Sequence, residues 1–141
     1  MAEYVMRHLV AKAGAARRIE VDSAATSRYQ IGELPHYGTR QVLAAHGVPC
    51  GKHRARQLTR RDYDRYDLII GMDKENLADI LHILGSDPQH KVRMLLDWSD
   101  RPREIADPWY TGDYETTYDD VYEGCSALLA HLLVPEESFD L

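Results

Sequence analysis

Asp107 is the residue whose type and setting most clearly point to chemistry. Pro108 disfavours helical geometry at the residue before it, so the Asp107 carboxyl is expected on a loop rather than inside a helix or strand. Two aromatic residues, Trp109 and Tyr110, follow directly, and either can form a wall of a slot for a flat phenyl ring. The alternative is an Asp-Pro turn on an acidic surface, with the aromatic side chains packed in the core.

A second candidate is the segment Cys50–Arg56, in which five residues separate a cysteine from an arginine. A functional interpretation makes Cys50 a nucleophile and Arg56 its phosphate ligand. Against this, a phosphate-binding Cys-x5-Arg loop follows an apolar strand and has a Ser or Thr after its arginine. Here the residue after Arg56 is Gln57, and no apolar strand precedes Cys50. We therefore interpret the string as a coincidence. Cys125 falls within a helical pattern and is predicted to be a packing cysteine.

Composition and charge exclude several classes of protein. The chain has 141 residues, which suits one domain, and its net charge of −6 argues against nucleic acid or an anionic membrane as a partner. Its longest apolar runs are shorter than the ~20 residues that a membrane span needs. Two cysteines are too few for a disulfide scaffold and suit a reducing cytoplasm, where we expect the protein. The seven histidines show no metal-ligand spacing, so no metal site or cofactor is proposed.

Helical and strand patterns alternate along the chain, which implies an α/β layer fold with a parallel sheet. Helices are predicted over residues 2–13, 40–46, 60–66, 74–84 and 114–133. Strands are predicted over residues 18–22, 67–72 and 92–97. Asp73 is placed to cap the fourth helix, and Thr59 with Asp62 resembles a capping box at the third. In the last helix, the residues expected to face inward are Val121, Leu128, Leu129 and Leu132.

The number of strands is low for such a fold, and the first element is a helix. A sheet protein that begins in this way looks as if a strand and a turn had been removed in front of it. We assign residues 1–134 to one domain and expect residues 135–141 to form a flexible tail.

Seven short segments between Met1 and about Leu133 stand in an order, and at spacings, that match a known family. They are Met1-Ala2-Glu3, Val21–Ser27, Ile31-Gly32 with Pro35, His46–Pro49, His53–Gln57, Tyr66–Ile69 leading to Met72-Asp73 and Asn76-Leu77, and Asp107–Tyr110. Each segment alone is a weak match, but seven in register are specific. The chain resembles the low-molecular-weight protein tyrosine phosphatases.

The resemblance implies a three-layer α/β sandwich with a small parallel sheet. In the family, the first, central strand leads into a Cys-x5-Arg-Ser loop, which runs directly into the helix that starts here at Met1. Backbone N–H groups and the helix N-terminus of such a loop bind a phosphate dianion and lower the pKa of the cysteine. We therefore expect the strand, the loop and the nucleophile to lie upstream of Met1, and the chain as given to be inactive.

The resemblance also assigns roles to residues of this chain. It makes Asp107 the general acid that protonates the leaving phenolate and then the base that activates water. The side chains that it places along the substrate slot are Tyr29, Trp109 and Tyr110. Those that it places behind the phosphate-binding loop, as braces, are Ser23 and His53.

The implied activity is hydrolysis of phosphotyrosine in proteins, or of small aryl phosphates, through a cysteinyl-phosphate intermediate and without a cofactor. Two alternatives stay open. An arsenate reductase of the same fold needs further redox cysteines, which Cys125 alone does not supply. A non-catalytic remnant that acts as a binding or regulatory module should keep the phosphate-binding loop, whereas this chain keeps Asp107 and lacks the loop.

Overall fold

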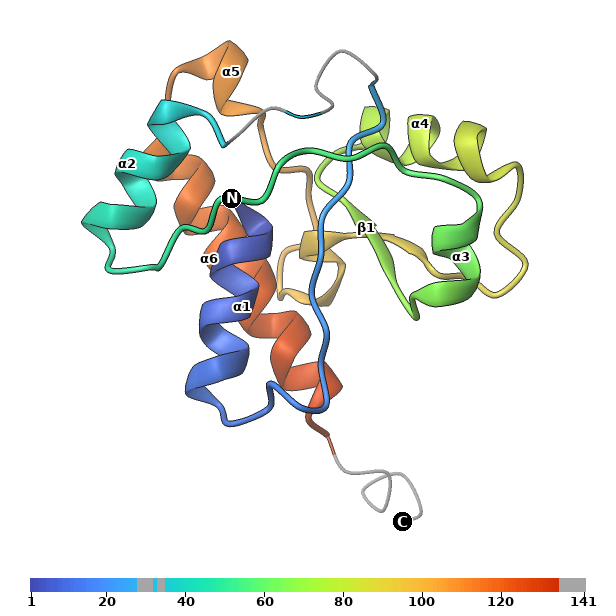
Figure 1. Ribbon diagram of the computed structural model, residues 1–141, viewed down its shortest axis with the longest axis horizontal. Coiled ribbons are helices and arrows are strands. Elements are labelled where there is room, and N and C mark those ends of the chain that lie inside the picture. The colour runs from blue at the N-terminus through green and yellow to red at the C-terminus, as the bar shows by residue number, and fades with distance from the viewer. Residues whose placement is uncertain (28–31, 33–34, 135–141) are drawn as a thin grey trace.

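The computed structural model describes residues 1–27, 32 and 35–134 of the chain (Figure 1). In these residues, a small parallel sheet lies between two groups of helices. One group consists of α1 (Ala2–Lys12), α2 (Tyr37–Ala45) and α6 (Tyr114–Leu132). The other consists of α3 (Arg61–Arg65) and α4 (Lys74–Leu84). The layered α/β fold predicted from the sequence is therefore confirmed.

The sheet is formed by β1 (Ile69–Gly71) and β2 (Val92–Met94), which pair in parallel. Both strands lie within predicted strands but are shorter. The strand predicted over residues 92–97 ends early, because a short 3₁₀ helix, η2 (Leu95–Trp98), follows it directly. The Asp97 side chain accepts a hydrogen bond from the Met94 N–H group (3.0 Å), and this local bond replaces a continued ladder.

The strand predicted over residues 18–22 is wrong. The segment follows an extended course in Figure 1, but in the described part of the chain it joins no sheet, and β1 pairs with β2 alone. The Val21 carbonyl accepts a hydrogen bond from Nη2 of Arg7 (2.7 Å) instead of from a neighbouring strand. An alternating pattern favours an extended backbone, yet a strand also needs a hydrogen-bonded neighbour.

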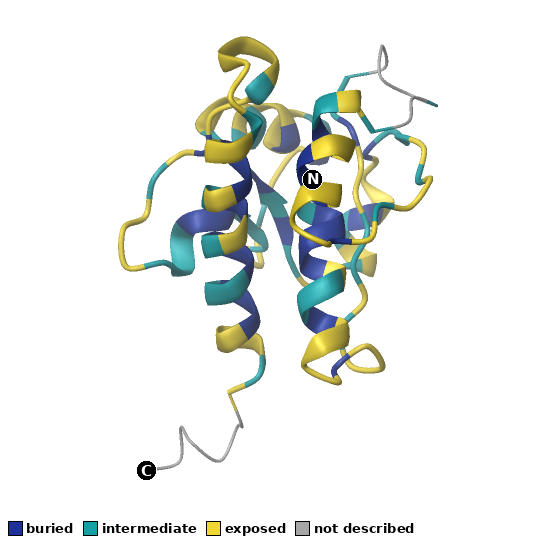
Figure 2. Ribbon diagram, turned by 90° about the vertical axis from the view of Figure 1, so that its left-hand side faces the viewer, coloured by how far each residue is buried: buried dark blue, intermediate teal, exposed yellow. Residues whose placement is uncertain are grey.

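Two hydrophobic clusters lie on the two sides of β1. Leu68 and Ile70 pack against the larger cluster, whereas Ile69 belongs to the smaller one, as the alternation of side chains along a strand requires. The larger cluster joins α1, α2, α6 and η2 through Val5, Met6, Val10, Val42, Leu43, Leu95, Leu96, Val121, Cys125 and Leu128. Figure 2 shows that the buried parts of α1 and α6 lie on the sides that face each other. None of the described helices is both long and apolar enough to span a membrane.

Capping residues explain most of the helix boundaries. Asp73 caps α4 as predicted, because its Oδ1 atom accepts a hydrogen bond from the Asn76 N–H group (2.7 Å). The helix predicted over residues 40–46 begins earlier, at Tyr37, because the imidazole of His36 caps it. The sequence pattern does not show this cap, since histidine is not among the residues that usually occupy the position.

The third and last helices agree with prediction except at their ends. One half of the predicted capping pair is present, because Oδ2 of Asp62 accepts a hydrogen bond from the Thr59 N–H group (2.9 Å). In α6, Val121, Leu128 and Leu129 are buried as expected. Leu132 is 39% exposed, so its predicted inward position is wrong; it is the last residue of the helix.

A glycine lets α6 approach η2 closely. A Cβ atom at Gly124 would lie 2.6 Å from Cγ of Leu95 and 3.2 Å from the Leu95 carbonyl oxygen. Leu95 is itself buried in the larger cluster, so it has little room to move away. Glycine is disfavoured inside a helix by about 1 kcal/mol relative to alanine, so its place here reflects the contact rather than helix propensity.

We expect Gly124→Ala to lower the free energy of unfolding by about 1–3 kcal/mol, because the added methyl group overpacks against Leu95. Helix propensity alone predicts the opposite sign. Urea unfolding followed by circular dichroism measures the change, and Ser126→Ala in the same helix is the matched control, expected to change stability little. A Gly124→Ala protein as stable as the wild type would contradict the close approach.

Candidate active site

Asp107 stands at the start of a short helix, α5 (Pro108–Thr111), and is exposed to solvent. Its backbone is extended (φ −74°, ψ 119°), as the following proline requires. Its Oδ1 atom accepts a hydrogen bond from the Trp109 N–H group (2.9 Å) and so caps the helix. The carboxyl is therefore held outside a regular element, as predicted, although the short helix that it caps was not expected.

The two aromatic residues that follow are exposed rather than packed in the core. Trp109 is 70% and Tyr110 85% exposed, which excludes the core-packing alternative for both. The Trp109 ring meets the His36 ring edge-on, with centroids 5.6 Å apart. Tyr110 and Asp107 share a cavity of about 270 Å³ with acidic residues around the start of α4. The cavity itself is largely acidic, so the exposed rings of Trp109 and Tyr110 are what suits the binding of a flat ring beside the carboxyl.

Two sequence predictions cannot be placed. Tyr29, the third residue expected along the substrate slot, lies outside the described residues. So does the segment 135–141, for which a flexible tail is predicted.

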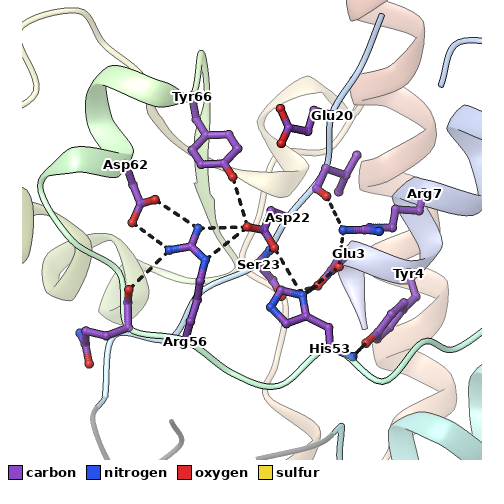
Figure 3. A network of polar contacts seen from close by, with 12 residues as sticks. Glu3, Tyr4, Arg7, Glu20, Asp22, Ser23, His53, Arg56, Asp62 and Tyr66 are labelled. Atoms are coloured by element: carbon purple, nitrogen blue, oxygen red, sulfur yellow. Dashed lines mark hydrogen bonds and ion pairs between the residues drawn. The ribbon is translucent and has the colours of Figure 1, made fainter. Parts of the chain in front are cut away.

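Ser23 and His53, the two predicted braces, meet at the first turn of α1 (Figure 3). The Ser23 hydroxyl donates a hydrogen bond to Oε1 of Glu3. Nδ1 of His53 lies 2.8 Å from the same oxygen and 3.3 Å from Oδ1 of Asp22. The Tyr4 hydroxyl accepts a hydrogen bond from the His53 backbone N–H group (3.0 Å), which fixes the loop that carries the imidazole. The structure therefore brings both braces together around one buried carboxylate.

Arg56 extends this network on the far side of Asp22. Its Nη2 atom lies 3.1 Å from Oδ2 of Asp22 and 3.1 Å from Oδ1 of Asp62. The Tyr66 hydroxyl donates to the same Asp22 oxygen (3.1 Å). Hydrogen bonding to Asp62, more than to Asp22, holds the pKa of the Arg56 guanidinium above its usual value.

Asp22 and Asp62 are kept ionised by their hydrogen bonds and by the charge of Arg56, although burial opposes ionisation. Burial by itself would raise the pKa of Asp22, but hydrogen bonds from the Ser23 N–H group and from Arg56 outweigh it and bring the pKa below its usual value. The pKa of Asp62 is lowered in the same way, against burial, by Arg56 and by the Thr59 N–H group. Both carboxylates are therefore ionised at neutral pH.

Neither cysteine is placed to act as the nucleophile. In the Cys50–Arg56 string, the residue considered as a phosphate ligand is Arg56, which is already bound to the carboxylates of Asp22 and Asp62. The next residue, Gln57, forms an isolated parallel β-bridge with Ala25. Cys125 is 1% exposed, and burial raises the pKa of its thiol to about 12, so it is not a thiolate at neutral pH. The interpretation of Cys125 as a packing residue agrees with its position in the larger cluster.

Sequence reasoning did not assign roles to Glu3, Asp22, Arg56 and Tyr66, which complete the network. An acidic residue in the first turn of a helix is usually an exposed partner of the helix dipole, so Glu3 gives no sign of being buried. Its partners come from 20 and 50 positions along the chain, a separation at which no local pattern operates. The one sequence signal that could have indicated these four residues is that they lie within the segments shared with the phosphatase family.

Comparison with known proteins gives this arrangement a context. A sequence profile described as low molecular weight phosphotyrosine protein phosphatase matches residues 1–137. The chain is 35% identical over 134 residues to the low molecular weight protein-tyrosine-phosphatase YfkJ of Bacillus subtilis, covering 94% of this chain and 86% of YfkJ. It is 37% identical over 134 residues to the low molecular weight phosphotyrosine protein phosphatase of Homo sapiens, covering 92% of this chain and 84% of that protein.

Solved structures lead to the same family. The crystal structure of YfkJ superposes with a TM-score of 0.88 at 34% identity, over 93% of this chain and 84% of that one. The low molecular weight protein tyrosine phosphatase SP-PTP of Streptococcus pyogenes superposes with a TM-score of 0.83 at 29% identity, over 99% of this chain and 87% of that one. With a matching fold and a profile match over nearly its whole length, the chain belongs to the low molecular weight phosphotyrosine protein phosphatases, which are phosphoric monoester hydrolases.

Proposed function

We propose that this chain provides the acid–base and substrate-binding parts of a protein tyrosine phosphatase, whose nucleophile is the cysteine of a Cys-x5-Arg-Ser loop that is not among the given residues. The observation that carries the proposal is the exposed Asp107 carboxyl, held by a capping bond next to two exposed aromatic side chains. A proton donor beside an aromatic surface is what the departure of a phenolate requires. The substrates are phosphotyrosine-containing proteins or small aryl phosphates, and the site of action is the cytoplasm.

Asp107 has two tasks in this reaction. In the reaction that the family resemblance implies, a cysteine thiolate of the Cys-x5-Arg-Ser loop displaces the phenolate from phosphorus, and Asp107 gives its proton to the departing phenolate oxygen. The ionised Asp107 then takes a proton from the water that attacks the cysteinyl phosphate, which releases inorganic phosphate. The carboxyl ends the cycle protonated, as it began.

The first turn of α1 is the expected position of the phosphate. The first N–H groups of a helix have no partner within the helix and attract anions. Glu3, in that turn, is neutralised by Arg7 (2.9 Å) and is hydrogen-bonded by Ser23 and His53, so its repulsion of a dianion bound at this turn is reduced. The network therefore supports the phosphate site instead of repelling its ligand.

An arsenate reductase is the less favoured assignment. That chemistry needs at least two thiols that exchange electrons in turn, whereas the buried Cys125 carries a thiol with a raised pKa. A binding module without catalysis has no structural observation in its favour. The exposed, capped Asp107 supports catalysis over both alternatives.

We expect the 141-residue protein to hydrolyse p-nitrophenyl phosphate no faster than a buffer blank, because it holds no activated thiolate. Cys50→Ser should leave that result unchanged, since Arg56 is bound to Asp22 and Asp62 and cannot hold phosphate beside Cys50. Release of p-nitrophenol measures the rate. Turnover that disappears in Cys50→Ser would make Cys50 the nucleophile and overturn the proposal.

A form extended by the coding sequence upstream of Met1 tests the role of Asp107. If that sequence supplies a strand and a Cys-x5-Arg-Ser loop, Asp107→Asn should lower kcat/KM, which reports the steps up to release of the phenolate, by about 10²–10⁴-fold with phenyl phosphate. The loss should be smaller with p-nitrophenyl phosphate, whose leaving group needs less protonation.

Asp100→Asn, in the same acidic stretch, is the control and should retain full activity. Equal losses with the two substrates would contradict general acid catalysis by Asp107. Inactivity of the extended form itself would contradict the proposed function.

A further inference from the structure

Three metal-ligating side chains converge at the first turn of α1, although no spacing in the sequence brings them together. Glu3, Asp22 and His53 each direct one ligand atom to a common region, and these atoms all lie within 4.8 Å of one another. Nδ1 of His53 is 2.8 Å from Oε1 of Glu3 and 3.3 Å from Oδ1 of Asp22 (Figure 3). Spacing along the chain does not reveal this cluster, because the three residues come from three separate segments.

The separations suit a small divalent cation. Zn²⁺ binds imidazole nitrogen and carboxylate oxygen at about 2.0–2.2 Å, so two ligand atoms of a tetrahedral site lie about 3.4 Å apart. The two distances from His53 are close to that value, and no two of the three ligand atoms lie more than 4.8 Å apart. Imidazole with two carboxylates is a donor set that favours Zn²⁺ and similar transition metals over Ca²⁺ or Mg²⁺.

The outer oxygens of both carboxylates are held by other residues. Oε2 of Glu3 binds Nη2 of Arg7 (2.9 Å), and Oδ2 of Asp22 binds Arg56 and the Tyr66 hydroxyl (both 3.1 Å). Nδ1 of His53 lies 3.1 Å from Oε2 of Glu3 as well as near Oε1. Ser23 donates hydrogen bonds to Oε1 of Glu3 and to Oδ1 of Asp22. Hydrogen bonds of this kind, from outside the ligand set, orient carboxylates in metal sites.

Solvent can reach the site even though one of its ligands is buried. The Glu3 side chain is 4% exposed, whereas those of Asp22 and His53 are 24% and 23% exposed. An ion can therefore enter from the side of the latter two and reach a carboxylate that is already fixed. Arg7 and Arg56 reduce the net negative charge, so the affinity is expected to be moderate rather than that of a structural zinc site.

We propose that Glu3, Asp22 and His53 form a binding site for a divalent transition-metal ion, with Zn²⁺ as the best-fitting cation. Coordination displaces the proton from Nδ1 of His53 to solvent and replaces its bonds to the two carboxylates. Water or the Ser23 hydroxyl completes the coordination. The ion would join the first turn of α1 to two segments that are distant in sequence, and would stabilise the fold accordingly.

The site is tested on the 141-residue protein with Co²⁺ and Zn²⁺ alone, so the outcome is independent of phosphatase activity. We expect saturable uptake of one Co²⁺ per chain, with the visible absorption of a tetrahedral N/O site, and displacement of Co²⁺ by Zn²⁺. His53→Gln and Asp22→Asn should each weaken binding by at least about tenfold. His82→Gln, at an exposed position in α4, is the matched control and should bind as the wild type does.

A second measurement needs no substitution and avoids variants that fold poorly. In the ring ¹⁵N spectrum of the wild-type protein, Zn²⁺ should shift Nδ1 of His53 before any other histidine nitrogen. The proposal is overturned by the absence of saturable uptake, by equal binding in His53→Gln and His82→Gln, or by a first shift at another histidine.

Discussion

A buried carboxylate at the start of a helix organises the rest of this structure. Glu3 is 7% exposed, and an ionised side chain at such a position is tolerated only when its oxygens are paired and hydrogen-bonded. Arg7, Ser23 and His53 meet that requirement, and the last two come from segments that are also joined to α1 and to each other by the Arg7–Val21, Tyr4–His53 and Ala25–Gln57 contacts. The need to satisfy one carboxylate thus helps to fix the segment around residue 23 and the loop around residue 53 against α1.

The same requirement extends outward through Asp22. Its carboxylate contacts His53 on one side and Arg56 and Tyr66 on the other. Arg56 also binds the buried Asp62 of α3, so Asp22 links the first turn of α1 to that helix. Arg56 suits this position because a planar guanidinium can bind two carboxylates at once, which a lysine cannot do in the same geometry. The segment that the sequence presents as a possible phosphate loop is therefore an ionic connection between two layers of the fold.

Sequence reasoning predicted most of the helices and both strands of the parallel sheet, but the strand over residues 18–22 was wrong, for a physical reason. Helices such as α4 are defined by local features, a capping Asp73 and a repeating apolar stripe, which can be read from neighbouring residues. The segment 18–22 has the alternation of a strand, but pairing depends on what lies beside it in space. Likewise, Asp107 could be found from the proline that follows it, whereas the burial of Glu3 depends on residues 20 and 50 positions away.

The bond that holds α5 in place has a consequence for the proton transfer proposed for Asp107. An ionised carboxylate is a strong acceptor for the Trp109 N–H group, and a neutral carboxyl is a weaker one. The hydrogen bond that caps the start of α5 is therefore stronger when Asp107 is ionised than when it carries a proton. Because Trp109 and Tyr110 belong to that helix, the roles proposed above imply that the two aromatic rings move most easily before Asp107 gives up its proton and are held more rigidly afterwards.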